Sequence, residues 1–145
     1  MQQELNISNS EMVIMRVIWS LGEAKVEDII HQISKRQDWS LATVKTLLGR
    51  LVKKGMLETE KDGRCFIYRP IVGEEDAIHL LTQELMEKIC ATKHAQAVSD
   101  AIDMASLTPQ DITMLTEKLQ HKTTVATVEC SCLDDDKDCH CRHHK

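Results

Sequence analysis

The chain has 145 residues, of which 42% are hydrophobic but only 3% aromatic, and its formal net charge is −5. This length fits one domain, or a small domain with an appendage. The sequence has no apolar run near the roughly 20 residues that cross a bilayer, and its start lacks the pattern of a signal peptide. We therefore expect a cytoplasmic protein that does not associate with membranes.

The charge is unevenly distributed along the chain. Residues 1–72 carry 11 Lys/Arg and 9 Asp/Glu, whereas residues 73–129 carry 4 and 10. Ser40–Lys54 contains four cations and no acid. A basic segment on an acidic protein suggests contact with a polyanion at one confined surface, although a solvated helix face has the same composition.

Three helices are predicted within residues 8–55. Ser8 and Glu11 have the spacing of a capping box, and the apolar stretch that follows ends at Gly22. The third helix covers Ser40–Lys54 and is closed by Gly55. The second is predicted from apolar residues at the spacing i, i+3, i+4 and i+7, which are Val26, Ile29, Ile30 and Ile33.

A β-hairpin is predicted to follow these helices. Residues 57–61 and 64–68 form two short strands around Asp62-Gly63, a pair that supplies the positive φ angles of a type I′ turn, and Pro70 ends the second strand. Three helices and a hairpin in this order indicate a winged helix-turn-helix, with Ser40–Lys54 as the recognition helix. Its outward donors and cations are expected to contact DNA. The candidate DNA-binding residues are Ser40, Thr43, Lys45, Thr46, Arg50 and Lys53 on the helix, and Lys61 and Arg64 beside the wing tip.

Residues 73–122 return to a helical pattern with apolar stripes between Ile78 and Leu119, and Thr108-Pro109 has the form of a helix start. These stripes pack either on the N-terminal domain or on a partner subunit. We favour a homodimer, because a helix-turn-helix usually reads two half-sites through a two-fold axis. The predicted protein is mainly α with a small β-hairpin. It has three parts: a DNA-binding domain (1–72), a helical dimerisation region (73–122) and a flexible metal-binding tail (123–145).

The tail contains two Cys-x-Cys pairs, Cys130/Cys132 and Cys139/Cys141. Four thiols this close in a cytosolic chain predict a metal site rather than disulfides, with a redox switch as the alternative. Thiolates favour Cu(I) and Zn(II) over Mg(II) and Ca(II). Structural zinc sites commonly use wider Cys-x₂₋₄-Cys pairs, so the spacing favours copper as the signal, although zinc can also occupy such a site.

The remaining cysteines and histidines carry weaker signals. Cys65 lies on a predicted strand and Cys90 late in a predicted helix, so we expect both to be small packed side chains rather than ligands. His140, His143 and His144 offer further imidazole ligands, but we favour the interpretation that they belong to a solvated polar terminus.

Three stretches support a family resemblance: Trp19–Gly22, Thr43–Gly55 with its Thr-Val-Lys-Thr-Leu start, and Tyr68–Pro70. Over about residues 8–122 the chain resembles the BlaI/MecI/CopY repressors, and its double Cys-x-Cys end is similar to the copper-responsive CopY branch. The six-residue spacer between its pairs is longer than the four residues typical of some members.

The resemblance implies winged-helix dimers that are joined through their C-terminal helices and bind pseudo-palindromic operators with TACA and TGTA half-sites. It implies that Zn(II) is held in the DNA-bound form and that Cu(I) replaces it and releases the operator. The β-lactam-responsive branch is inactivated by proteolysis, but Asp100–Asp103 lacks the Asn-Phe bond associated with that cleavage.

The leading interpretation is thus a copper-responsive transcriptional repressor, with operator DNA, a second copy and a copper chaperone as partners. The alternative is a cytosolic metal buffer or chaperone whose helical body only dimerises, which the basic Ser40–Lys54 segment argues against. We find no phosphate-binding Gly-rich loop and no nucleophile motif, so we do not expect an enzyme.

Overall fold

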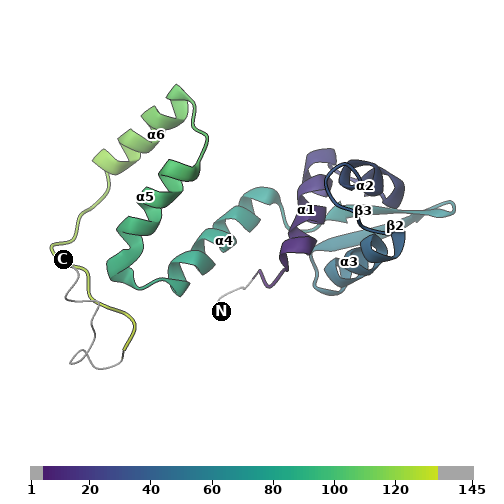
Figure 1. Cartoon of the computed structure of the whole chain (residues 1–145), viewed down its shortest axis with the longest axis horizontal. Coiled ribbons are helices and arrows are strands. Elements are labelled where there is room, and N and C mark those ends of the chain that lie inside the picture. Colours follow the sequence, from purple (N-terminus) through teal and green to yellow (C-terminus); the bar gives the residue numbers. More distant parts are fainter. Residues whose placement is uncertain (1–4, 134–145) are drawn as a thin grey trace. The chain divides into compact units, whose positions relative to one another are not determined.

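The computed structural model describes residues 5–133 of the chain (Figure 1). It divides into two units, Met1–Thr82 and Gln83–Lys145, and each is described by itself. Among the described residues, no helix is both long and apolar enough to cross a bilayer.

The N-terminal unit begins with the three predicted helices, α1 (Asn9–Leu21), α2 (Val26–Ile33) and α3 (Leu41–Lys53). The predicted capping box at the start of α1 is confirmed, because the Ser8 hydroxyl accepts from the Glu11 N–H and the Glu11 carboxylate accepts from the Ser8 N–H. Gly22 ends the helix with a φ of 84°, a backbone conformation in which a side chain would be strained.

The sheet has three antiparallel strands rather than the two that the hairpin predicts. Its order is β1-β3-β2, with β1 at Ala24–Lys25, β2 at Leu57–Asp62 and β3 at Cys65–Pro70. The strand β1 has no signal in the sequence, because two residues are too few to show an alternating pattern. Only pairing with Ile67 and Tyr68 of β3 makes this segment a strand.

The turn of the hairpin lies one residue later than predicted. Asp62 pairs with Cys65, so Gly63 and Arg64 form the turn, and Asp62 belongs to β2. Gly63 has a φ of 65°, whereas Arg64 has no positive φ. This pattern is that of a type II′ turn, which needs glycine only at its first central position. The shift places Arg64 at the tip of the hairpin.

The core of the N-terminal unit lies between the three helices and the sheet. The Trp19 indole closes one side of it, because its N–H donates to the carbonyl of Val72 over 2.9 Å. Ala77 of the next helix is also part of this core. The largest fully buried side chains are Ile14, Met15, Ile18, Ile29, Val44, Leu48, Leu51 and Leu57.

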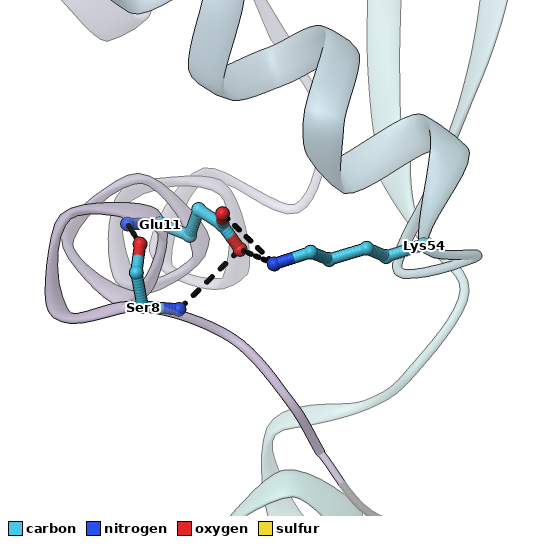
Figure 2. A network of polar contacts seen from close by, with 3 residues as sticks. All are labelled: Ser8, Glu11 and Lys54. Carbon is cyan, nitrogen blue, oxygen red and sulfur yellow. Dashed lines mark hydrogen bonds and ion pairs between the residues drawn. The ribbon is translucent and has the colours of Figure 1, made fainter.

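One ion pair joins the first helix to the third. The Glu11 side chain is 3% exposed, and the Lys54 ammonium lies 2.9 and 2.7 Å from its two carboxylate oxygens (Figure 2). Lys54 is the C-terminal cap residue of α3 and is 34% exposed at its side chain. Glu11 therefore holds the start of α1 and, through Lys54, the end of α3.

The remaining helices are α4 (Glu74–Lys88), a short 3₁₀ turn η1 (Ala91–Lys93), α5 (His94–Met104) and α6 (Pro109–Gln120). The predicted start of α6 is confirmed, since Thr108 and Asp111 form a capping box ahead of Pro109. Neither α5 nor α6 contains a buried residue. Large apolar side chains stay exposed along all three α-helices, namely Ile78, Leu81, Leu85, Val98, Ile102, Met104, Ile112, Met114 and Leu119.

The ion pair predicts a difference between two neighbouring lysines. Lys54→Met leaves the Glu11 carboxylate buried without its cation, so the free energy of unfolding should fall by about 2–3 kcal/mol, less than a fully buried pair loses because Lys54 is partly exposed. Lys53→Met removes an exposed cation one residue earlier and should change stability by about 0.5 kcal/mol or less. Urea unfolding of the two variants tests this difference, and equal losses would contradict the assigned role of Lys54.

Candidate DNA-binding surface and cysteine cluster

The third helix separates apolar and polar side chains onto two faces. Val44, Leu47, Leu48 and Leu51 are buried against the rest of the N-terminal unit. All six predicted DNA-binding residues of this helix are exposed, as are Lys61 and Arg64 of the hairpin. The prediction that these eight side chains face solvent is confirmed.

The hydroxyl groups on the exposed face already bond within the helix. The Ser40 hydroxyl accepts from the Thr43 N–H over 3.1 Å and lies 3.0 Å from the Thr43 hydroxyl, so both belong to the helix cap. The Thr46 hydroxyl donates to the Ala42 carbonyl over 2.9 Å. The Thr46 proton and one of the two hydroxyl protons of the Ser40–Thr43 pair are thus used within the helix, which leaves the cations as the main free donors.

The cations of this surface divide into paired and unpaired groups. Lys54 is engaged by Glu11, and Arg69 of β3 contacts Glu23 and Glu60, which raise the pKa of its guanidinium. Within residues 5–133, no acidic side chain pairs with the predicted DNA-contacting cations. Those cations are Lys45, Arg50, Lys53, Lys61 and Arg64.

A shallow hollow of about 290 Å³ lies on the outer face of α3. It is open to solvent and is lined by Ala42, Thr43, Thr46 and Leu47. Arg50 borders it on the next turn of the helix. Arg50 and the two threonines therefore border the same part of α3.

The second site is a cluster of three cysteines in the C-terminal unit. The sulfur atoms of Cys90, Cys130 and Cys132 all lie within 4.8 Å of one another. The Cys90 and Cys130 sulfurs are 3.5 Å apart, and the Cys132 N–H donates to the Cys130 sulfur over 3.3 Å. Cys130 is buried, Cys90 is half-buried and Cys132 is exposed.

The turn that follows α4 holds Cys90 in place. The His94 Nε2 lies 2.8 Å from the Met86 carbonyl and 2.9 Å from the Ile89 carbonyl, so the imidazole caps the open end of α4. The tail is attached to the same turn, because the Ala91 N–H donates to the Ser131 hydroxyl over 3.3 Å. His94 showed no role in the sequence, since capping by a side chain eight residues from its acceptor has no recurring spacing.

The environment of Cys90 favours its thiolate form. The Thr92 hydroxyl lies 3.2 Å from the Cys90 sulfur. Hydrogen bonding by the side chain of Thr92, followed by the backbone of Ser131 and Thr92, lowers the pKa of the Cys90 thiol to about 5. The thiolate is the form of cysteine that binds metals.

The cluster fits a soft metal ion in its donor set and its spacing. A metal–sulfur bond of about 2.3 Å places two ligand sulfurs about 3.8 Å apart in a tetrahedral site. The Cys90 and Cys130 sulfurs are 3.5 Å apart, and the Cys132 sulfur lies within 4.8 Å of both. Of the four predicted ligands, the structure brings together Cys130 and Cys132, while Cys139 and Cys141 lie outside the described residues.

The prediction for Cys90 requires correction. Cys90 follows the end of α4 rather than lying within it, and its sulfur belongs to the cysteine cluster instead of the apolar core. No local spacing in the sequence indicates this contact, because Cys90 and Cys130 are 40 residues apart. Cys65 lies on β3 as predicted and is half-buried.

Comparison with known proteins places the whole helical part of the chain in one family. The penicillinase repressor family profile matches residues 7–121. The chain is 42% identical over 135 residues to an uncharacterized 16.5 kDa protein in the ptsI 3′ region of Latilactobacillus sakei, with 92% of each chain covered. It is 32% identical over 117 residues to the penicillinase repressor of Bacillus licheniformis, which covers 80% of this chain and 91% of that protein.

A solved structure described as "CopR Repressor Structure" is 66% identical, covers 47% of this chain and 99% of its own, and has a TM-score of 0.41. The family match covers well over half of the sequence, and the relatives are matched over nearly their full lengths. The chain therefore belongs to the penicillinase repressor family, the BlaI/MecI/CopY family of DNA-binding transcriptional repressors, which are not enzymes.

Proposed function

We propose that this protein is a cytoplasmic, copper-responsive transcriptional repressor. It binds a pseudo-palindromic operator as a homodimer, holds Zn(II) in the DNA-bound form, and leaves the operator when Cu(I) displaces Zn(II) from the Cys-x-Cys pairs. The observation that carries the proposal is the approach of Cys130 and Cys132, the first pair, to a third thiol within 4.8 Å. Such a cluster of soft donors on a member of a repressor family supports a metal as the signal.

DNA binding is assigned to α3 and to the hairpin. Lys45, Arg50 and Lys53 extend from the face of α3 that the core does not use, and Lys61 and Arg64 extend from the hairpin. Cations without an acidic partner release counterions from phosphates when they bind, and arginine also reads guanine directly. Ser40, Thr43 and Thr46 are assigned to the same interface, with their hydroxyls as acceptors or as contacts to backbone and sugar.

The four tail cysteines Cys130, Cys132, Cys139 and Cys141 are assigned as the metal ligands. Thiolate is a softer donor than any other side chain of the chain, and Cu(I) outcompetes Zn(II) at all-thiolate sites of low coordination number. A copper chaperone is the partner from which the ion would be received, because transfer between thiolates avoids free Cu(I). The alternative of a plain metal buffer leaves the unpaired cations of α3 without a role.

Dimerisation is assigned to the helices that follow the winged unit. Their exposed apolar side chains include Leu85, Ile102 and Leu119, which are 47%, 43% and 61% exposed in the single chain. Apolar side chains that recur along three successive helices are typical of a subunit interface rather than of a solvated surface. A second copy would bury these stripes and bring two recognition helices to one operator.

Removal of single cations from α3 should weaken operator binding. We expect Lys45→Ala and Arg50→Ala each to cost about 1–3 kcal/mol on a duplex with an inverted TACA/TGTA repeat, because each loses a base or phosphate contact. Fluorescence anisotropy at several salt concentrations measures this, and the affinity of the unaltered protein should fall steeply with salt. Lys122→Ala, which removes the same charge beyond α6, is the control. Unchanged affinity in both α3 variants would exclude this helix as the recognition helix.

A charge placed in an apolar stripe should weaken the dimer. Ile102→Asp would bury an unpaired carboxylate in the interface, so we expect the dimer dissociation constant to rise at least about tenfold. Gln96→Asp introduces the same charge at an exposed polar position of α5 and should leave dimerisation nearly unchanged. Sedimentation velocity over a concentration series separates the two variants, and equally stable dimers would place the interface elsewhere.

Replacement of the four tail cysteines by serine should remove the response to copper. A hydroxyl is a hard, weakly acidic donor, so the variant should bind Cu(I) poorly and stay on the operator when copper is added. A gel shift titrated separately with Zn(II) and with Cu(I) under reducing conditions tests this against Cys65→Ser, which should respond like the unaltered protein. Release of the four-serine variant by copper would move the sensor to another part of the chain.

A further inference from the structure

The cysteine cluster contains one thiol that the Cys-x-Cys pairs do not supply. Cys90 precedes η1, whereas Cys130 and Cys132 follow α6, and the tail meets the turn at these residues. The Cys90 and Cys130 sulfurs are 3.5 Å apart, which is within hydrogen-bonding distance for two sulfur atoms. Among residues 5–133, the cluster of buried apolar residues lies in the N-terminal unit and does not include Cys90.

Contacts other than sulfur also hold the two segments together. The Ala91 N–H, next to Cys90, donates to the hydroxyl of Ser131, which lies between the two tail cysteines. His94 satisfies the last carbonyls of α4 and so fixes the turn from the other side. These contacts hold the three sulfurs near one another, which lowers the entropic cost of assembling a site.

We propose that Cys90 is a metal ligand and completes, with Cys130 and Cys132, a three-thiolate site for a soft ion such as Cu(I) or Zn(II). This inference rests on the proposed function, because the same tail pair takes part. Three sulfurs at this spacing satisfy a trigonal ion, and they leave a fourth position that the second Cys-x-Cys pair or another donor can fill.

Ligation by Cys90 would give the metal a structural effect that the tail pairs alone do not have. A bond from the ion to Cys90 and to Cys130 closes a loop that contains α5 and α6, the helices assigned to the dimer. Closing a loop restricts the conformations of the residues inside it. The state of the metal site would thus act on the dimer helices themselves, and not only on the end of the chain.

Differential alkylation of the full-length, reduced protein tests the inference without any substitution. Iodoacetamide labelling followed by peptide mass spectrometry is compared with and without one equivalent of Zn(II). Labelling of Cys90, Cys130 and Cys132 should slow together by at least about tenfold, because a thiolate bound to the ion is not free to attack iodoacetamide. Cys65 should be labelled equally in both samples. Protection of the tail cysteines with no change at Cys90 would overturn the proposal.

Co(II) gives a second measurement, because the intensity of its thiolate charge-transfer band follows the number of Co–S bonds. The background is Cys139→Ser/Cys141→Ser, which leaves the three clustered thiols and Cys65. Adding Cys90→Ser should lower the band by about a third and weaken Co(II) binding at least about tenfold. Adding Cys65→Ser, the matched control, should change neither. An undiminished band in the Cys90→Ser protein would overturn the proposal.

A further protein separates this inference from the proposed function. The variant with all four tail cysteines changed to serine should show no thiolate band, since Cys90 alone cannot hold the ion. If the unaltered protein shows no band either, both the tail site and the role of Cys90 are wrong. If the tail cysteines give a band that is independent of Cys90, only the inference about Cys90 fails.

Discussion

Among the described residues, Glu11 is the one charged side chain that is buried, and the arrangement of the winged unit depends on how its charge is neutralised. Its carboxylate accepts from the Ser8 N–H and from the Lys54 ammonium, so it belongs both to a helix cap and to an ion pair (Figure 2). A carboxylate without these partners would be costly at this position. The pair thereby fixes the C-terminal end of α3 against the N-terminal end of α1.

That constraint decides which cations face outward. Lys54 turns to Glu11 and Arg69 lies between Glu23 and Glu60, so both charges are used within the fold. Lys53 precedes Lys54 by one residue and stays exposed, as do Arg50 and Lys45, which lie about one and two turns earlier. Glu11, Glu23 and Glu60 thus neutralise the cations that hold the structure together. Among the described residues, no acid pairs with the predicted DNA-contacting cations on the outer face of α3 and on the hairpin. An acidic protein can in this way present a local basic surface to DNA.

The cysteine cluster is also held in place by contacts of neighbouring side chains, here through hydrogen bonds instead of an ion pair. Its geometry depends on His94, which occupies the last carbonyls of α4, and on Ser131, which binds the turn through the Ala91 N–H. Hydrogen bonding from Thr92 stabilises the thiolate form of Cys90. In both sites a few hydrogen bonds between segments that are distant in sequence place the functional groups, and the groups themselves belong to short, recognisable motifs.

Local patterns were enough to predict the helices, their starts at Ser8, Ser40 and Thr108, and the exposed face of α3. Capping and amphipathic spacing act within one or two helical turns, so the residues involved are close neighbours in the sequence. The same holds for the Cys-x-Cys pairs as candidate soft ligands. The family resemblance rested on such local strings and is confirmed.

Tertiary structure alone decided the features that join distant segments. The strand at Ala24–Lys25 exists only through its pairing with β3, and this pairing accompanies a hairpin turn at Gly63-Arg64 instead of Asp62-Gly63. In the sequence, Lys54 does not differ from the other cations of the basic helix, and only the folded structure brings Glu11 beside it. Cys90 was predicted to be a packed side chain, but in the folded chain its sulfur contacts that of Cys130, which is 40 residues away in the sequence. Such contacts depend on how the chain closes loops in space, and no short-range spacing encodes them.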